Sequence, residues 1–215
     1  MNTMSMESKR RPYDSRTRRA QAHRNRAAIL RSARDRFLAD GYAATTIATI
    51  ADDAQLSIDT VYKTFGGKGG LVRAIYEDSL QGSGPTAAPL RSDELQNSDA
   101  DAHAIVRGWG TLTAEVAPLV APVHLLVRDA AASDPEMAAL LRDSDTSRRA
   151  RMRHNAQSLA DRGELRVGMT VAEATDVMWA FSAPELFELL VLRSGWSPEH
   201  FGRYVAESLE SALLD

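Results

Sequence analysis

A closely spaced pair of short helical patterns within residues 45–65 most constrains how this chain can fold. The first pattern, residues 47–54, follows Thr46, and the second, residues 58–65, follows Ser57; both residues are preferred helix N-caps. Gln55 and Leu56 leave room only for a tight connection between them. The apolar positions recur at helical spacing and form one inward stripe on each segment: Ile47, Ile50, Ala51, Ala54, Leu56, Val61 and Phe65.

Helical patterns also flank this pair on both sides. From Arg24 onward, Ile29, Ala33 and Phe37 recur at four-residue spacing, which predicts an amphipathic helix that ends at Gly41. Gly66, Gly67, Gly69 and Gly70 surround Lys68 and break the chain, after which apolar spacing resumes through Leu80. The first 80 residues therefore predict a small helical head.

The rest of the chain predicts a larger helical body and no strand. Residues 81–100 contain glycine, proline and small polar residues, and we expect a connecting loop there. Five helices should follow, with Pro118 ending the first of them and Pro184 kinking the fourth. Their expected ranges are 102–116, 119–132, 135–162, 171–193 and 198–214. The predicted fold class is all-α.

The paired short helices have the features of a helix-turn-helix. Ala51 and Ala54 are small enough for two helices to cross closely, and the second helix keeps a polar outer face that fits the major groove of DNA. A small helical bundle without DNA binding is the structural alternative. Charge favours DNA: residues 1–80 carry a net charge of +5 and the remainder carries −8. Uneven solvation alone is the other interpretation of that asymmetry.

The segment from Thr45 to Leu71, TTIATIADDAQLSIDTVYKTFGGKGGL, resembles the DNA-binding domain of the TetR family of transcriptional regulators. The resemblance covers roughly residues 25–80. It rests on these positions: Thr46, Ile50, Ala51, Ala54, Ser57, Thr60, Val61, Tyr62, Phe65, Lys68 and Leu71. It implies a disordered basic arm (1–23), a three-helix DNA-binding domain (24–68) and a helical effector-binding and dimerisation domain (69–215).

The resemblance also implies which residues touch double-stranded DNA. Thr46 and Lys68 should meet phosphates, where free N–H groups at helix N-termini attract anions. The major-groove residues should be Ser57, Ile58, Asp59, Thr60, Tyr62 and Lys63. Core packing is the alternative for Tyr62. The basic arm, if it has a role, would follow phosphates.

Three positions depart from the family pattern. Asp59 stands where a small residue is usual, and it could either cap its helix or accept a hydrogen bond from cytosine. Thr64 and Gly69 replace a histidine and an acidic residue, so the groups that would hold Lys68 in place are not evident from the sequence.

The body is expected to bind an unknown small-molecule effector and a second copy of the chain. Candidate pocket residues are Trp109, Leu112, His124, Arg128, Met152, Asn155, Met178, Trp179 and Phe181, although each could simply fill the core, and Asp129 or Glu115 could satisfy Arg128. Residues 171–193 hold more apolar side chains than one helix face can hide. This predicts a homodimer through residues 171–193 and 198–214, with a palindromic operator.

Other functions find little support in the sequence. The chain has no cysteine, its five histidines show no metal-ligand spacing, and the glycines around Lys68 lack the serine or threonine of a phosphate loop. We therefore expect no catalytic residues, no metal and no cofactor. We also expect no membrane span and a cytoplasmic location. The remaining alternative is a protein that coats DNA without sequence preference and without an effector.

Overall fold

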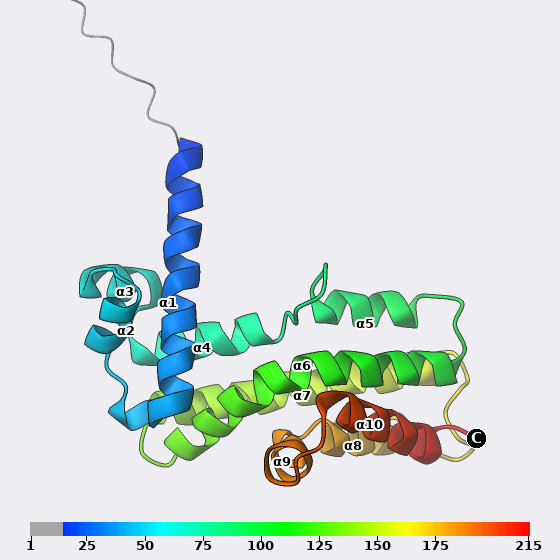
Figure 1. The fold of residues 1–215 in the computed structure, drawn as a ribbon. Helices are drawn as coiled ribbons and strands as arrows, with labels where there is room; N and C mark the ends of the chain where they lie inside the picture. The colour runs from blue at the N-terminus through cyan, green and yellow to red at the C-terminus, as the bar shows by residue number, and fades with distance from the viewer. Residues whose placement is uncertain (1–14) are drawn as a thin grey trace, which may run out of the picture.

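The computed structural model describes residues 15–215, which form helices and no strand (Figure 1). The elements in chain order are α1 (Ser15–Ala44), α2 (Ile47–Asp53), α3 (Ile58–Phe65), α4 (Lys68–Ser79), α5 (Ala88–Gln96), α6 (Ala102–Ala130), α7 (Pro135–Asp161), α8 (Val171–Phe181), α9 (Pro184–Phe187), the π-helical turn η1 (Glu188–Arg193) and α10 (Pro198–Leu213). The all-α fold with an N-terminal helix-turn-helix is confirmed.

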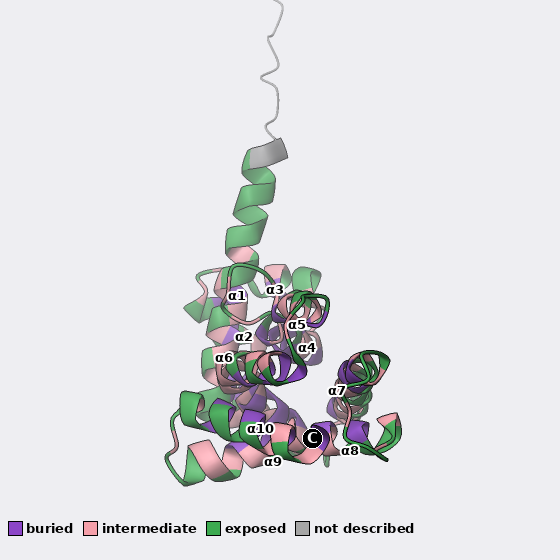
Figure 2. Cartoon of the chain, turned by 90° about the vertical axis from the view of Figure 1, so that its right-hand side faces the viewer, coloured by how far each residue is buried: buried purple, intermediate pink, exposed green. Residues whose placement is uncertain are grey.

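The first helix begins earlier than the sequence predicts. We expected it to start at Arg24, with residues 1–23 as a disordered arm; residues 15–23 instead continue α1, and residues 1–14 lie outside the described part. Arginine and alanine dominate this extension, and both are strong helix formers even where no tertiary packing helps. Figure 2 shows the exposed turns from residue 17 onward standing clear of the other helices. The helix geometry breaks at Gly41, as predicted, with φ at 81°.

One hydrophobic core joins the head (α1–α4) to the adjoining ends of α6 and α7. Ile29, Ala33 and Phe37 of α1 pack with the buried face of α4, and the same cluster continues into the body. Its body members are Val123, Val127, Ala130, Met137 and Leu140. The predicted domain boundary between residues 68 and 69 stays a prediction, because one hydrophobic core contains residues from both sides of it.

A single helix, α6, replaces the two that we expected on either side of Pro118. It runs through both Pro118 and Pro122. A proline removes one backbone donor, but packing of α6 against α1, α4, α5, α7 and α10 holds the helix continuous. Within the described residues α6 is also the one helix whose length and composition would suit a membrane span, which is weak evidence for a span. Its place at the centre of the body gives its apolar side chains partners within the protein.

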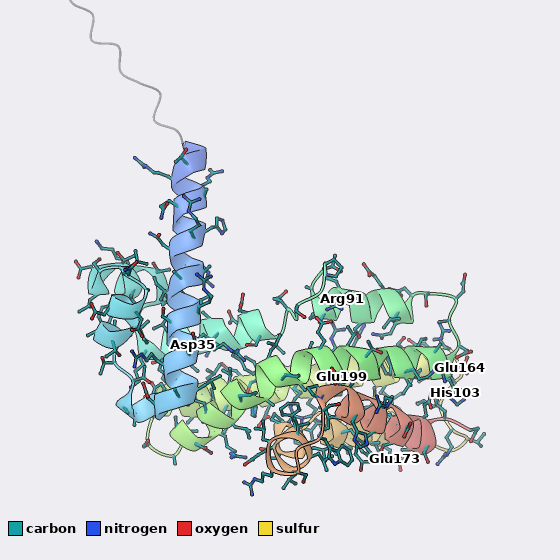
Figure 3. The ribbon with its side chains drawn as sticks, viewed as in Figure 1. Asp35, Arg91, His103, Glu164, Glu173 and Glu199 are labelled. Atoms are coloured by element: carbon teal, nitrogen blue, oxygen red, sulfur yellow. The ribbon has the colours of Figure 1, made fainter. Side chains whose placement is uncertain are left out.

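A helix, α5, occupies part of the predicted loop at residues 81–100. Pro89 stands in its first turn, where a missing N–H costs nothing. Arg91 on α5, labelled in Figure 3, donates to both carboxylate oxygens of Glu115 on α6, at 2.8 and 2.6 Å. That ion pair, with the Ser83 and Gly84 N–H groups, holds the pKa of Glu115 at about 2. Tertiary contacts of this kind fix α5 where its own apolar pattern is weak.

The predicted helix at residues 171–193 is broken at Pro184. Ala183 takes an extended conformation, as the residue before proline prefers, so α8 ends at Phe181 and the chain restarts as α9 and η1. The expected kink is therefore a full break.

The last helix crosses α6 at very close range. A β-carbon on Gly110 would lie 2.6 Å from both the Gly202 carbonyl oxygen and the Ala206 β-carbon, and one on Gly202 would collide with the Gly110 carbonyl. Phe201, Val205 and Leu209 of α10 are buried by this contact. These side chains therefore belong to the body's own core.

Gly110→Ala should lower the free energy of unfolding by about 1–3 kcal/mol, because backbone atoms of α10 would have to move. Gly108→Ala on the same helix is the matched control, since its new methyl group meets only the flexible end of Leu95. Urea denaturation of both variants measures the difference. Equal stability of the two would contradict the proposed close crossing.

Candidate nucleic-acid interface and effector cavity

The connection between α2 and α3 forms the sharp turn of a helix-turn-helix. Thr46 caps α2 by accepting the Thr49 N–H at 3.1 Å, and Ser57 caps α3 by accepting the Thr60 N–H at 3.2 Å. Between them Gln55 adopts a left-handed conformation, with φ at 55°. This conformation, costly for a residue with a side chain, turns the chain within two residues. The predicted caps and the predicted tight connection are both present.

One face of α3 is buried and the other is free for a partner. Val61 is fully buried against the head core, whereas Ile58 and Tyr62 are 45% and 50% exposed. Ser57, Asp59 and Lys63 are also exposed, and Thr60 is half-buried. The structure thus brings the predicted major-groove residues onto one surface. Core packing of Tyr62, the alternative interpretation, is wrong.

Ser57 caps α3, and this bears on Asp59. The Ser57 hydroxyl accepts the Thr60 N–H and so makes the N-cap hydrogen bond of α3. It also forms a hydrogen bond with the Thr60 hydroxyl at 2.8 Å. Asp59 lies in the first turn of α3, where a carboxylate interacts favourably with the helix dipole. The capping alternative for Asp59 is therefore excluded.

Lys68 is held beside the α1–α2 corner by two contacts that the sequence did not reveal. Its ammonium group lies 4.4 Å from the centre of the Tyr42 ring and donates to the Ala43 carbonyl at 3.3 Å. Partial burial lowers the pKa of Lys68. Thr46 is three residues beyond Ala43, so both predicted phosphate contacts belong to one part of the head surface.

Tyr42 links this corner to the body. Its hydroxyl donates to Asp134 Oδ2 at 2.8 Å, and the other carboxylate oxygen caps α7 by accepting the N–H groups of Glu136 and Met137. These bonds hold the pKa of Asp134 below its usual value, with the Tyr42 hydroxyl as the largest cause. Gly69 fits here too, because a β-carbon would strike the Glu136 carboxylate. That contact is with the end of an exposed, flexible side chain, so it does not by itself require glycine at this position.

The body contains a cavity of about 380 Å³ that is partly open to the surface. Its walls come from α4, α5, α6, α7, α8, α9 and α10, and most of the lining side chains are apolar. Seven of the predicted pocket residues line it: Trp109, Leu112, His124, Met152, Asn155, Met178 and Phe181.

Two predicted pocket residues, Arg128 and Trp179, lie outside the cavity. Arg128 donates to the carboxylates of Asp129 at 3.1 Å and Glu188 at 3.3 Å. Of the two partners that the sequence suggested, Asp129 and Glu115, the structure therefore shows Asp129. Trp179 packs beside the guanidinium groups of Arg148 and Arg149. Its neighbour Met178 takes the inward position, because successive side chains point about 100° apart around a helix.

Other lining residues were missed by the sequence analysis. They include Tyr76 of α4 and its C-cap Leu80, Arg148 and Arg151 of α7, Phe187 of α9 and Phe201 of α10. Phe187 and Phe201 carried the signal of apolar residues, but they belong to the two segments whose apolar surface was expected to divide between the body's core and a second subunit. The arginines gave no signal, because nothing in their local pattern indicates which way they face.

These two features define the class of the molecule: a DNA-binding helix-turn-helix head joined to a hollow helical body. Residues 29–75 match the family model described as bacterial regulatory proteins, tetR family. The N-terminal part of the chain is therefore a DNA-binding domain of the tetR type, as its sequence motif predicts.

Solved structures share the fold over most of the chain. SmeT in a triclosan complex is 18% identical, with a TM-score of 0.72, covering 89% of this chain and 92% of that one. NalD from Pseudomonas aeruginosa, the secondary repressor of the MexAB-OprM multidrug efflux pump, is 19% identical, with a TM-score of 0.66 and coverage of 91% and 98%. A putative regulator from Saccharomonospora viridis in complex with choline is 18% identical, with a TM-score of 0.67 and coverage of 88% and 97%. No curated protein matches the sequence.

Tyr42→Phe should lower the free energy of unfolding by about 1 kcal/mol, because it removes the bond to Asp134 but keeps the ring beneath Lys68. Tyr62→Phe is the control, since its ring is half exposed on α3. Urea denaturation compares the two. Equal effects of the two changes would show that the Tyr42 hydroxyl does not join head and body.

Proposed function

We propose that this regulator acts in the cytoplasm as a homodimeric repressor that binds a palindromic operator and is released when a small molecule fills the cavity. The observation that carries the proposal is the position of α4. Lys68, a predicted phosphate contact, begins this helix, and Tyr76 and Leu80 near its end line the cavity. A ligand that contacts the end of α4 can therefore change the placement of the DNA-binding head.

In this proposal, ligand binding and DNA binding are coupled because the ligand has a different affinity for two arrangements of the protein, the one that binds the operator and the one in which the head has moved. α4 packs on α1 and α6 at once, so any tilt of α4 moves the head relative to the body. In a dimer, that movement changes the distance between the two α3 helices. Only one spacing matches half-sites separated by a helical turn of DNA or a multiple of it.

Exposed apolar side chains support a dimer through the C-terminal helices. Leu189 and Leu192 of η1 are 53% and 54% exposed, and Tyr204 of α10 is also exposed. Tyr204 lies beside Phe181 of α8 and beside Trp196, which follows η1 in the chain. A second copy of the chain would cover them. Phe201, Val205, Leu209 and Leu213 are buried in the body and take no part.

Two solved structures of similar fold contain a small molecule, triclosan in one and choline in the other, which supports a small-molecule effector for this chain. Coating of DNA without sequence preference is the main alternative, and it would leave the cavity without a role. Among residues 15–215, no group of three or more His, Asp or Glu residues is arranged to hold a metal.

Selection of random duplex DNA by the purified protein at near-physiological salt tests this function. We expect recovery of a palindrome and a preference of roughly 10³-fold or more over unrelated DNA. Binding without a recovered motif, with affinity that depends only on salt, would instead establish coating.

Leu192→Glu should convert the dimer to a monomer, because a carboxylate cannot be buried without a partner in an apolar interface. Operator affinity should fall with it, since each half-site would then be bound separately. Leu90→Glu on α5 is the control, because Leu90 is equally exposed but lies away from η1. Sedimentation velocity gives the oligomeric state; a dimeric Leu192→Glu variant would refute this interface.

Lys68→Met should weaken binding to all DNA sequences alike and reduce the salt dependence by about one ion, because it removes a phosphate contact while keeping the packing on Tyr42. Lys63→Ala and Thr60→Ala should also change base preference, by about 1–3 kcal/mol at the affected position. Fluorescence anisotropy with operator and mutated operators measures both. If all three variants bind as the parent does, the assigned recognition surface is wrong.

A further inference from the structure

We propose that Arg34 sets the spacing of half-sites that the dimer accepts, because it holds the DNA-binding head at one angle to α6. The proposal rests on the proposed function in assuming a dimer on a palindromic operator, and it adds a residue that determines specificity without touching DNA. Arg34 lies on α1, which packs on both α4 and α6 (Figure 1). It acts as a positioning residue for α3.

The Arg34 guanidinium bonds to two helices at once. One nitrogen donates to the Ser79 hydroxyl at 2.7 Å, and another donates to the Leu119 carbonyl at 2.8 Å. Ser79, at the end of α4, is buried and itself donates to the Ile75 carbonyl at 2.7 Å. A guanidinium presents its donors in a rigid planar fork, so the two bonds together fix its position. Arg34 thereby joins α1 and α4 of the head to α6 of the body.

The acceptor on α6 lies where that helix lacks some of its own hydrogen bonds. Leu119 stands between Pro118 and Pro122, and neither proline has an N–H group to donate within the helix. A stretch of helix with fewer internal bonds bends more easily. The bond from Arg34 to Leu119 therefore supports α6 at the place where it would bend first.

Partial burial makes these two bonds necessary. Arg34 is half-buried, and burial lowers its pKa, an effect that the carboxylates of Asp35 and Asp78 oppose. A partly desolvated guanidinium without hydrogen bonds would be a charge without compensation, which is costly. The arrangement that satisfies Arg34 is thus favoured over those in which the head has turned.

The polar bonds fix an angle that the shared hydrophobic core does not. Apolar contacts are non-directional, so helices packed by them can slide or rotate by small amounts. The bond from Tyr42 to Asp134 holds the head near the start of α4, where Lys68 contacts the Tyr42 ring. Arg34 holds it near the end of α4, about 16 Å away at 1.5 Å per residue. Two points so far apart define the direction of α4, whereas one alone would act as a pivot.

The dimer converts this angle into a spacing. The proposed interface lies on η1 and α10, and α10 packs closely on α6. Arg34 therefore connects the head to the helix that supports the interface, and the angle between them sets the distance between the two α3 helices. One extra base pair moves the half-sites apart by about 3.4 Å and turns them by about 35°. A head held at one angle cannot follow this change, whereas a head that is free to turn can.

Operators with altered spacers test the inference on the full-length protein. The palindrome recovered by selection is compared with versions that carry one base pair more or one fewer between the half-sites, and fluorescence anisotropy gives each affinity. The parent protein should lose about tenfold or more on both altered spacers, and Arg34→Met should lose less than about threefold. Affinity for a duplex with one half-site should be unchanged, because Arg34 lies outside the predicted DNA-binding residues.

Ser79→Ala is a second variant with little risk to folding, because alanine favours a helix and only the hydroxyl is lost. It removes one of the two acceptors of Arg34 and should give a spacer preference between those of the parent and Arg34→Met. Arg31→Met is the matched control, since it removes the same charge from an exposed position of α1 and should keep the parent's preference. A loss of folded protein would weaken binding to every spacer by the same factor, so the ratio reports position alone.

A parent-like spacer preference in both Arg34→Met and Ser79→Ala would overturn the inference and leave the proposed function in place. If Arg34→Met does not fold, a parent-like Ser79→Ala is sufficient for that conclusion. Weaker half-site binding by Arg34→Met would also overturn the inference, because the residue would then act on DNA contact itself. A parent protein that selects no palindrome, or accepts all spacers alike, would overturn the dimeric function and this inference with it.

Discussion

The packing of α4 is the constraint on which the rest of this structure depends. Leu71, Val72 and Ile75 on this helix are buried in a core shared by the head and by the ends of α6 and α7. Because close-packed interiors resist continuous deformation, the head cannot move alone and must shift together with α4. The bond from Tyr42 to Asp134 adds a second connection at the other end of the interface. The helix-turn-helix is thus held by the body as well as by its own residues.

The local parts of the fold could be predicted from the sequence, and the parts fixed by distant contacts could not. Thr46, Ser57 and Gly41 mark helix ends through hydrogen bonds or backbone angles within a few residues, so their pattern was sufficient. Pro118 misled the prediction because its local cost is outweighed by helices that pack on α6 from several sides. Likewise α5 has little apolar periodicity and depends on Arg91 and Glu115.

The two candidate sites differ in the same way. The predicted major-groove residues belong to one short helix and its N-cap, where sequence order and helix geometry fix which side chains share a face. The cavity is built from seven helices, so its lining depends on how they pack. His124, Asn155 and Met178 were found because isolated polar or soft residues in apolar segments stand out, whereas Arg148 and Tyr76 follow the ordinary pattern of their helices. Arg128 stood out as well, yet its long side chain reaches the carboxylates of η1.

Helix length explains why a modest change in the cavity is sufficient for the proposed release. At 1.5 Å per residue, the 12 residues of α4 span about 18 Å, so a tilt of ~5° about one end moves the other by roughly 1.5 Å. That shift is about half the length of a hydrogen bond, and it would act on the α1–α2 corner that holds Lys68. Phosphate and base contacts made by rigid side chains tolerate such a displacement poorly. The proposed effector therefore needs only to bind more tightly to the tilted arrangement of α4 than to the one that fits DNA.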